Sequence, residues 1–599
     1  MNLGIDFGST STCFSTYDHA TGAVLPCQID NTDMIDSIAC INFMNRLFFG
    51  EAAKDTLRND PSSRGYKAFK MLLTEKDAQK LAKWGYDSHN TPQRIAERFL
   101  ANYIRRISDN NLNRIDKLVI CVPELWTSDR AIRKGLLDGR AILRDACKTI
   151  TKQLYGQPSN VQVISEPAAA SAFFAHKYKN TYGTDFQGHV LIIDYGGGTL
   201  DLTLTEVMPR GDNSAEIAVR HQYGVGENEE QEIGKGGIAY MDRVLALALR
   251  DQNIPADFSA SNTELYQATA LFERYLKSQS LHHRTIPEHG NIFDDEDSSE
   301  DFLDALDLCL DDFRRLEDNH NIFTQVRYQN RLIPITYSHL YQAFAQVVEP
   351  SLTECLNHMV NWMDIENQTA VKHRQQPPYQ YQDANAHNFH IVLVGGFGKF
   401  LLVQRSVQEF FRCSAANDRR FSLDFANDRE YAVSKGAALL AADQIVLHHT
   451  APYGIGITYK DSSNSQVIYR RLAIKCRQHY QHDEPYWIGS HCILNVRNSI
   501  DSFLIGHDSH RNVARPAIMT PEMQSRIDEA FQDLLREYAL VYPERCAQAS
   551  LHRVGFSMDP SGVLSFLLQS DDRKIMVSKE LALLSHLFDI SESEEVPLK

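Results

Sequence analysis

Two short stretches of the sequence place an aspartate directly before a glycine-rich turn that carries hydroxyl side chains. They are GIDFGST, with Asp6, Gly8, Ser9 and Thr10, and IIDYGGGT, with Asp194, Gly196, Gly197, Gly198 and Thr199. Successive glycines are costly in a regular element, so they indicate backbone that turns sharply or approaches another group closely. The N–H groups of such a turn, with Ser and Thr hydroxyls, can bind phosphate oxygens. Either turn alone could be a tight hairpin, but the pair predicts a nucleotide phosphate site.

The two aspartates also predict a metal ion. Asp6 and Asp194 would repel the phosphates of a nucleotide unless a cation lay between them. Mg²⁺ is commonly held by a few carboxylates together with phosphates, and it keeps several water ligands. We therefore expect Asp6 and Asp194 to act on Mg²⁺ partly through water. Neither turn matches the Walker or the GxGxxG pattern.

The elements around these turns alternate between strands and helices, which is typical of an α/β protein. Strands are expected on both sides of each turn, at 3–18 and 189–207, and again at 117–126. Helices are expected at 65–84, 91–107 (with Thr91 as N-cap and Pro92 in the first position) and 128–155. A strand, a turn and a helix are expected over 161–178, a loop and a helix over 232–249, and a strand, a glycine turn and a helix over 388–411.

The repeated order of strand, acid and glycine turn predicts two similar lobes that face one cleft. The polar stretch 361–388 has few apolar residues, and we expect a surface insertion there. The acidic run 294–313 has apolar residues at helical spacing, so it predicts an amphipathic helix with a solvated face. Near the C-terminus we expect strands at 453–459 and 493–496, a helix at 522–542 and a hairpin at 554–568.

Composition favours a cytoplasmic protein with neither a membrane nor a nucleic-acid partner. The 599 residues carry a net charge of −16 without a dominant basic cluster. The sequence has no apolar run near the roughly 18 to 20 residues that cross a bilayer. The N-terminus lacks the basic segment of a secretion signal. Eleven cysteines without a CxxC pattern indicate reduced thiols.

Five motifs, in chain order, resemble the ATPase domain of the DnaK-type heat-shock chaperones, within the actin and hexokinase ATPase superfamily. They are GIDFGSTSTC, CVPELWTSDRAI, VISEPAAASAFF, LIIDYGGGTLDLTL and IVLVGGFGKFLLVQRSVQEFF, and they cover roughly residues 2 to 445. The resemblance implies a two-lobed α/β fold with lobe I at 1–188 and lobe II at 189–447, closing on Mg-ATP. Residues 448–599 would form a small α+β domain, similar to a reduced substrate-binding domain and too short for a full helical lid. Residues 445–447 could be a short strand or a helix end.

The resemblance also assigns roles to individual residues. It implies that Lys70 positions the attacking water, that Glu166 organises the waters of Mg²⁺, and that Pro123 links the nucleotide state to the domain surface. Without the resemblance, Lys70 would be interpreted as a surface lysine, Glu166 as the start of a helix and Pro123 as the end of a strand. The resemblance further implies ATP-binding roles for Asp201, Gly236, Gly237, Glu273, Lys277, Gly395, Gly396 and Phe397, besides the residues of the two turns. Glu273 and Lys277 could instead be an exposed pair one helical turn apart.

Two positions depart from the family pattern. Phe397 and Lys399 stand where the family typically has serine and arginine, so the base of the nucleotide could be bound differently. The function implied is a slowly ATP-hydrolysing chaperone whose nucleotide state controls binding of unfolded or client polypeptide, with a co-chaperone or nucleotide-exchange factor as a further partner. Two alternatives remain open: a nucleotide-dependent scaffold or actin-like assembly protein with little hydrolysis, and a small-molecule kinase of the same superfamily.

Overall fold

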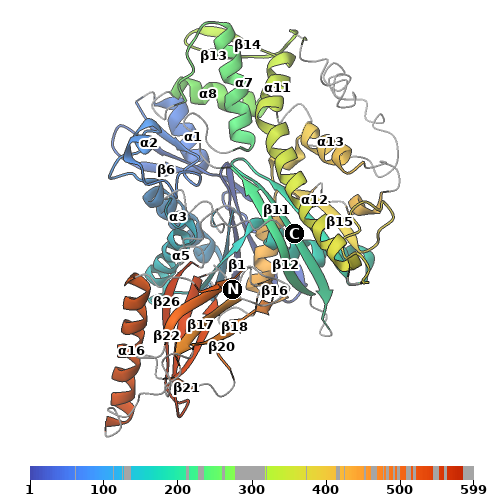
Figure 1. Ribbon diagram of the computed structural model, residues 1–599. Coiled ribbons are helices and arrows are strands. Elements are labelled where there is room, and N and C mark those ends of the chain that lie inside the picture. Colours follow the sequence, from blue (N-terminus) through green and yellow to red (C-terminus); the bar gives the residue numbers. More distant parts are fainter. Residues whose placement is uncertain are drawn as a thin grey trace. The chain divides into compact units, whose positions relative to one another are not determined.

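The computed structural model covers 599 residues and describes most of them (Figure 1). The described residues are 1–60, 62–111, 114–123, 126, 136–210, 215–226, 235–258, 263–276, 318, 320–372, 374–412, 418–423, 425, 427–450, 454–460, 468–475, 478–480, 484–489, 493–494, 500–506, 515–516, 521–543, 552–558 and 563–583. The chain divides into two compact units, each treated by itself below. Unit 1 comprises Met1–Trp126 and Arg133–Leu447, and unit 2 comprises Thr127–Ile132 and His448–Lys599.

The first large sheet of unit 1, here the β1 sheet, has the strand order β3-β2-β1-β8-β9, with β4 beside β2. Its strands are β1 (Asn2–Phe7), β2 (Ser11–Asp18), β3 (Ala23–Pro26), β4 (Met34–Asp36), β8 (Lys117–Val122) and β9 (Asn160–Ser165). β1 and β2 form an antiparallel hairpin, whereas β1, β8 and β9 are parallel. Alternate β1 residues Leu3, Ile5 and Phe7 share a buried core with helix α3 (Pro92–Asn111) and helix α5 (Gly139–Tyr155).

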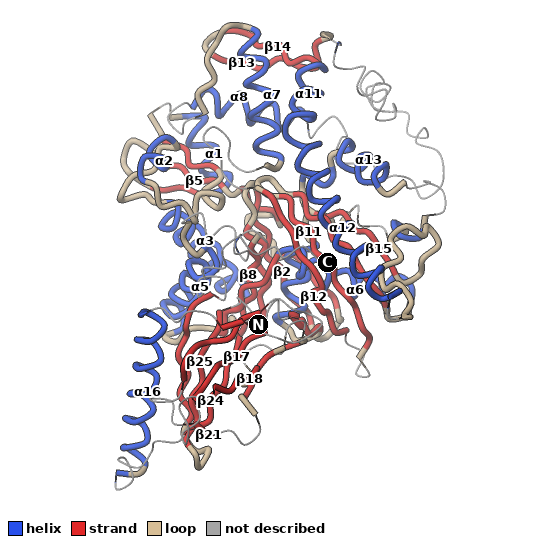
Figure 2. The backbone as a smooth tube through the Cα atoms, in the orientation of Figure 1, coloured by secondary structure: helices blue, strands red, loops and turns tan. Residues whose placement is uncertain are grey.

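The second large sheet, here the β10 sheet, has the order β15-β10-β11-β12-β16 within unit 1. Its strands β11, β12 and β15 are labelled in Figure 2. Its strands are β10 (Gly188–Tyr195), β11 (Leu200–Pro209), β12 (Ala215–Val225), β15 (Phe389–Val394) and β16 (Ile445–Thr450). β10, β11 and β12 are antiparallel, and β10 is parallel to β15. One face packs on a core formed with α7 (Gly237–Asp251), α8 (Thr263–Leu276), α11 (Tyr337–Ala343), α12 (Glu349–Lys372) and α13 (Leu401–Phe410).

Two helices, α6 (Glu166–Tyr182) and α14 (Ala432–Ala441), lie against the remaining faces of both sheets. Their core contains Val119 and Cys121 from the β1 sheet and Val190 and Ile192 from the β10 sheet. Side chains alternate between the two faces of a strand. Asp6 of β1 and Asp194 of β10 therefore point toward this helix layer from their two sheets. The helices meet closely, because a Cβ on Gly436 would lie 1.7 Å from the carbonyl oxygen of Ala169. A Cβ on Gly4 of β1 would likewise lie 2.2 Å from the Ala438 nitrogen.

Smaller elements complete unit 1. Beside the β1 sheet lie β5 (Ile38–Ile41), β6 (Leu47–Phe49), β7 (Arg64–Lys67), α1 (Gly50–Asn59) and α2 (Ala78–Lys83). A hairpin of β13 (Ile322–Tyr328) and β14 (Arg331–Thr336) packs on α8 and α7. The α/β class predicted from the sequence is confirmed.

The described part of unit 2 contains two antiparallel sheets, one long helix and the short strand β19, which pairs with β16. One sheet has the order β18-β17-β22-β23 and the other β20-β24-β25-β26, with β21 also beside β24. The strands are β17 (Gly454–Lys460), β18 (Ile468–Ile474), β19 (His479–Tyr480), β20 (Tyr486–Trp487), β21 (Ile493–Leu494), β22 (Ile500–Gly506), β23 (Arg515–Pro516), β24 (His552–Met558), β25 (Val563–Ser570) and β26 (Met576–Leu583). Helix α16 (Pro521–Val541) contributes Ile527, Ala530, Phe531, Leu534 and Tyr538 to one core with strands of both sheets. Among the described residues, no helix is both long and apolar enough to cross a membrane.

The structure corrects one sequence-based expectation, decides a second and does not reach a third. The helix predicted over 65–84 is wrong for most of its length: β7 is followed by turns, and only α2 is helical. Residues 68–75 are all buried, so they lack the exposed face of an amphipathic helix, and Ala68 has a left-handed φ of 54°. Residues 445–447 begin a strand, β16. The acidic run 294–313 lies outside the described residues.

The segment 361–388 lies largely at the surface as predicted, since most of residues 374–388 are exposed, but it is not a separate insertion. Its first part continues α12 to Lys372, and its second part packs back on that helix. The Asn367 side chain makes two hydrogen bonds to the backbone of Tyr379, at 2.9 and 3.0 Å. Tyr381 is buried and donates a 2.7 Å hydrogen bond to Asp364. These hydrogen bonds fasten the exposed segment to α12 at Tyr379 and Tyr381.

Candidate functional site

The first glycine turn connects β1 to β2 immediately after Asp6. A Cβ on Gly8 would lie 2.0 Å from the Ser11 carbonyl oxygen, so the tight turn requires glycine. Asp6 is in register with Cys13 of β2 on one side and with Cys121 of β8 on the other. Burial is the main cause that raises the pKa of both thiols well above the ordinary value. Asp6 therefore lies between two buried thiols on the neighbouring strands.

The second glycine turn connects β10 to β11 and rests on the start of α7. Gly196 N–H donates to the Thr199 carbonyl at 3.0 Å, which closes the turn. The N–H groups of Lys235 and Ile238 donate to the carbonyls of Gly198 and Gly197, both at 2.8 Å. A Cβ on Gly236 would lie 2.5 Å from the Gly196 carbonyl oxygen. The predicted residues Gly236 and Gly237 thus support the turn from behind.

The two glycine turns come from different sheets and touch each other. A Cβ on Gly197 would lie 2.6 Å from Cγ2 of Thr10, and one on Gly198 would lie 2.7 Å from Oγ of Ser9. The side chain of Met71 also contacts Gly198, at 2.2 Å from such a Cβ. The structure therefore brings together the hydroxyls of the first turn and the backbone of the second.

A buried ion pair lies at this meeting point. Lys70 donates a hydrogen bond to Glu166, and their side chains are only 3% and 9% exposed. Although burial opposes its charge, Glu166, Asp6 and Asp201 raise the pKa of Lys70 above the ordinary value. The structure places Lys70 in a turn, held by a 3.0 Å hydrogen bond from Leu73 N–H to the Lys70 carbonyl.

The aspartates around Lys70 resist ionisation. Burial, with help from Glu166, raises the pKa of Asp6 to about 7 although Lys70 opposes this. Burial, and then Glu166, Asp6 and Asp201, raise the pKa of Asp194 well above the ordinary range. Asp194 and Asp201 face each other across β10 and β11. Four acids thus surround one ammonium group, and a cation would relieve their mutual repulsion.

This donor set fits a hydrated magnesium ion. Among the described residues, no three His, Cys, Asp or Glu side chains are close enough to hold a metal ion directly. The predicted metal residues Asp6, Asp194 and Glu166 supply hard carboxylate oxygens, and Mg²⁺ accepts such oxygens with water in between. The fit is therefore to an ion bound largely through its own water ligands.

Glu166 is the first residue of α6 and follows β9 directly. Ser165, at the N-cap, makes no capping hydrogen bond of its own, and its hydroxyl accepts a 3.0 Å hydrogen bond from Gln222 Nε2 of β12. Pro123 is buried at the end of β8, where its carbonyl accepts from Trp126 N–H at 3.2 Å. No pattern in the sequence predicted that Gln222 or Met71 would lie at this site. The pairing of Cys13 and Cys121 with Asp6 could be predicted only from the strand register.

The third glycine turn, after β15, lies beside Asp194. Gly395 has a φ of 84°, and a Cβ there would lie 2.5 Å from Oδ1 of Asp194. Gly396 is exposed. Phe397 is buried, its ring centroid 5.0 Å from that of Tyr195. Lys399 forms a 2.7 Å ion pair with Glu430.

Three predicted nucleotide-binding residues remain: Phe397, Glu273 and Lys277. Phe397 also stacks on Phe400 with centroids 5.2 Å apart, so the structure places it in an aromatic cluster under Gly237. Glu273 lies half-buried on α8. Lys277 lies outside the described residues.

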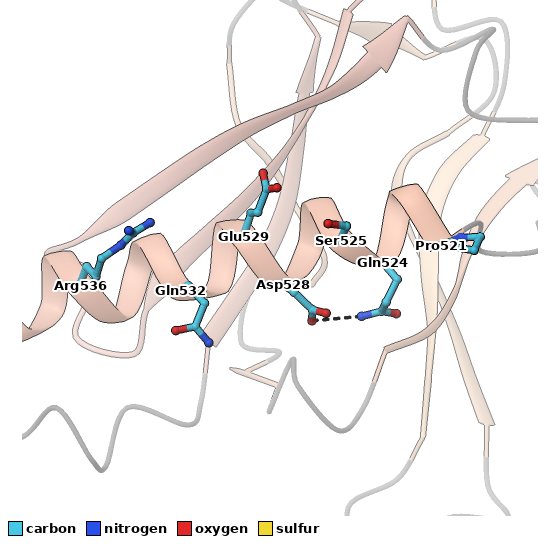
Figure 3. A pocket seen from close by; sticks show the side chains of 7 residues that line it. All are labelled: Pro521, Gln524, Ser525, Asp528, Glu529, Gln532 and Arg536. Atoms are coloured by element: carbon cyan, nitrogen blue, oxygen red, sulfur yellow. Dashed lines mark hydrogen bonds between the residues drawn. The ribbon is translucent and has the colours of Figure 1, made fainter.

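A separate hollow lies along α16 in unit 2 (Figure 3). It is lined by Pro521, Gln524, Ser525, Asp528, Glu529, Gln532 and Arg536. Gln524 donates a 3.2 Å hydrogen bond to Asp528 within it. None of these residues belongs to the site around Asp6, so the hollow adds nothing to the nucleotide prediction.

Comparison with known proteins gives a partial likeness to a chaperone. No protein-family model matches the chain. The chaperone protein DnaK of Mycoplasmoides gallisepticum (strain R(low / passage 15 / clone 2)) is 26% identical over 212 residues. This match covers 34% of the chain and 30% of the length of that DnaK. It indicates a distant DnaK-like relationship over about a third of the chain.

Proposed function

We propose that the chain binds MgATP where the two glycine turns meet and hydrolyses it slowly, and that the nucleotide state controls binding of unfolded or client polypeptide. The observation that carries this proposal is the contact of Gly197 with Thr10 beside the buried pair of Lys70 and Glu166. The distant likeness to a DnaK supports the same activity.

In this proposal unit 1 is an actin-like ATPase with lobe I at 1–188 and lobe II at 189–447. Residues 448–599 form the reduced substrate-binding-like domain. The protein acts in the cytoplasm with a co-chaperone or nucleotide-exchange factor. The backbone amides of the two turns and the hydroxyls of Thr10 and Thr199 bind phosphate oxygens.

Each charged residue then has a distinct task. Lys70 neutralises phosphate charge and orients the attacking water. Glu166 fixes the Lys70 ammonium, and Asp6 and Asp194 order the metal-bound waters. Mg²⁺, when bound, neutralises phosphate charge and polarises the phosphoryl group. Catalysis of this kind depends on positioning and preorganised charge, so no covalent intermediate is needed.

The test is phosphate release by the purified full chain with MgATP, with nucleotide affinity measured in parallel. Thr199→Val and Lys70→Met should each slow hydrolysis at least about 10²-fold, as loss of one preorganised group commonly does. Both variants should retain nucleotide binding. Lys80→Met is the matched control, because Lys80 is half-exposed on α2 and pairs only with Glu75 at 3.4 Å among the described groups.

Two outcomes would decide against this activity. ATP binding with turnover no faster than buffer would favour the scaffold interpretation, which concentration-dependent sedimentation with ATP would then examine. Equal hydrolysis by wild type, Thr199→Val and Lys70→Met would mean that the catalytic site lies elsewhere.

A further inference from the structure

Two histidines face each other on the far side of the β10 sheet from α6. Nε2 of His221, on β12, lies 3.1 Å from Nε2 of His358, on α12. We infer that His221 and His358 form a binding site for a divalent transition-metal cation of the Zn²⁺ class, separate from the site around Asp6.

The spacing of the two nitrogens suits a shared metal ion. Imidazole nitrogens bind tetrahedral Zn²⁺ at about 2.0 to 2.1 Å, which places two such donors about 3.3 Å from each other. The observed separation is 3.1 Å, with the rings 11° from parallel and their centroids 5.2 Å apart. A proton shared between the nitrogens would hold them at a similar distance, and a metal ion can replace that proton.

Both imidazoles are held in place by aromatic neighbours. The His221 ring stacks on Trp362, with centroids 4.5 Å apart and planes 3° apart. The His358 ring stacks on Tyr223, with centroids 3.8 Å apart and planes 18° apart. Each element therefore supplies one histidine and one aromatic ring, at i, i+2 on the strand and i, i+4 on the helix. Such support fixes the donors before a ligand arrives.

The surrounding charge also favours a cation. Glu354 lies one helical turn before His358, and its carboxylate accepts a 2.7 Å hydrogen bond from the Tyr223 hydroxyl.

The donor set defines the class of metal. In the described part of the chain, no group of three or more His, Cys, Asp or Glu side chains could hold a metal ion. The two imidazoles are therefore the protein ligands, and water completes the coordination of an exchangeable ion. Imidazole suits Zn²⁺, Cu²⁺ and Ni²⁺, whereas Mg²⁺ prefers oxygen. The site thus differs in chemistry from the carboxylates around Asp6.

The test is a Zn²⁺ titration of the full chain after chelator treatment, followed by calorimetry, for wild type, His221→Asn and His358→Asn. Wild type should bind one more equivalent than either variant, or bind it at least tenfold more tightly. His89→Asn is the matched control, because His89 is exposed ahead of α3, and it should behave as wild type. Zn²⁺ should also raise the thermal midpoint of wild type and His89→Asn more than that of the two variants.

A second readout does not depend on how the variants fold. Co²⁺ added to wild type should give the visible absorption of imidazole-bound cobalt, and one equivalent of Zn²⁺ should remove it. Failure to see that band in wild type would overturn the inference. Equal Zn²⁺ stoichiometry and affinity in wild type and both variants would also overturn it, leaving only a hydrogen bond between the rings.

Discussion

The ammonium of Lys70 and the carboxylate of Glu166 form a hydrogen-bonded ion pair that is almost completely removed from solvent. They come from a turn after β7 and from the first residue of α6, 96 positions apart. Lys70 is also the cation that opposes the rise in the pKa of both Asp6 and Asp194. One side chain therefore compensates a whole group of buried acids.

Replacing Lys70 by methionine should lower the free energy of unfolding by about 3 to 5 kcal/mol at pH 8, because it leaves buried carboxylates uncompensated. The loss should shrink toward pH 6. Acids with a raised pKa in the folded state bind more protons there than in the unfolded state, so stability falls as pH rises. Urea unfolding at both pH values measures this. A variant equally stable at pH 6 and pH 8, relative to wild type, would contradict it.

A methyl group on Gly436 should destabilise unit 1. It would lie 1.7 Å from the Ala169 carbonyl oxygen, so α14 and α6 must move apart. Gly436→Ala should cost about 1 to 3 kcal/mol despite the better helix propensity of alanine. Gly183→Ala is the comparison, because a Cβ there meets nothing within 4 Å and only the left-handed φ of 69° opposes it. Thermal unfolding should rank Gly436→Ala below Gly183→Ala; the reverse order would be inconsistent with a tight helix contact.

Gln222 should influence hydrolysis by positioning Glu166. Its amide holds the Ser165 hydroxyl at 3.0 Å, one residue before the catalytic glutamate of the proposal. Gln222→Met should slow single-turnover phosphate release about 3- to 10-fold with nucleotide affinity changed less than about twofold, the pattern of an interaction that matters only in the transition state. Glu216→Gln, on the same strand, serves as control. A loss of affinity without a change in rate would assign Gln222 a binding role instead.

His390 should make unit 1 sensitive to acid. Burial, followed by the nearby His387, lowers the pKa of His390 to about 4, and Phe174 and Phe186 pack around its ring. In the unfolded chain the His390 imidazole binds a proton near pH 6.5, whereas in the folded chain it does so only near pH 4. The contribution of neutral His390 to stability is therefore complete above pH 6.5 and declines below it. Between pH 7 and pH 5 this amounts to about 2 kcal/mol.

His390→Phe should remove that decline while keeping the aromatic packing. Urea midpoints of wild type and variant at pH 7 and pH 5 test this. If both proteins lose the same stability on acidification, other groups are responsible and His390 is not the sensor.

The sequence predicted local turns and a helix start better than it predicted contacts between distant segments. Strong local patterns were sufficient for the hairpin around Gly8, for the turn around Gly197 and for helix α3, which begins after Thr91 as expected. These depend on neighbours in sequence, and glycine or capping chemistry marks them directly. The α/β class followed from the same alternation.

Other features depended on contacts between distant residues. The segment around Lys70 has enough apolar residues to look helical, but all of 68–75 is buried, which no periodicity reveals. Residues 361–388 are polar and mostly exposed, and only the hydrogen bonds of Asn367 to Tyr379 and of Tyr381 to Asp364 show that the segment is fastened to α12. The link from Gln222 to Ser165 spans 57 positions, so it had no local signal.

The position of α16 in the chain restricts how unit 2 can open. The helix precedes β24, β25 and β26, and five of its apolar side chains are embedded with those strands. Displacing the helix would expose these side chains to water, and Ile527, Phe531 and Leu534 alone each contribute about 1.5 to 3 kcal/mol by burial, a large part of the stability of a domain. α16 is therefore an integral part of the core of unit 2, and its displacement would amount to unfolding that core.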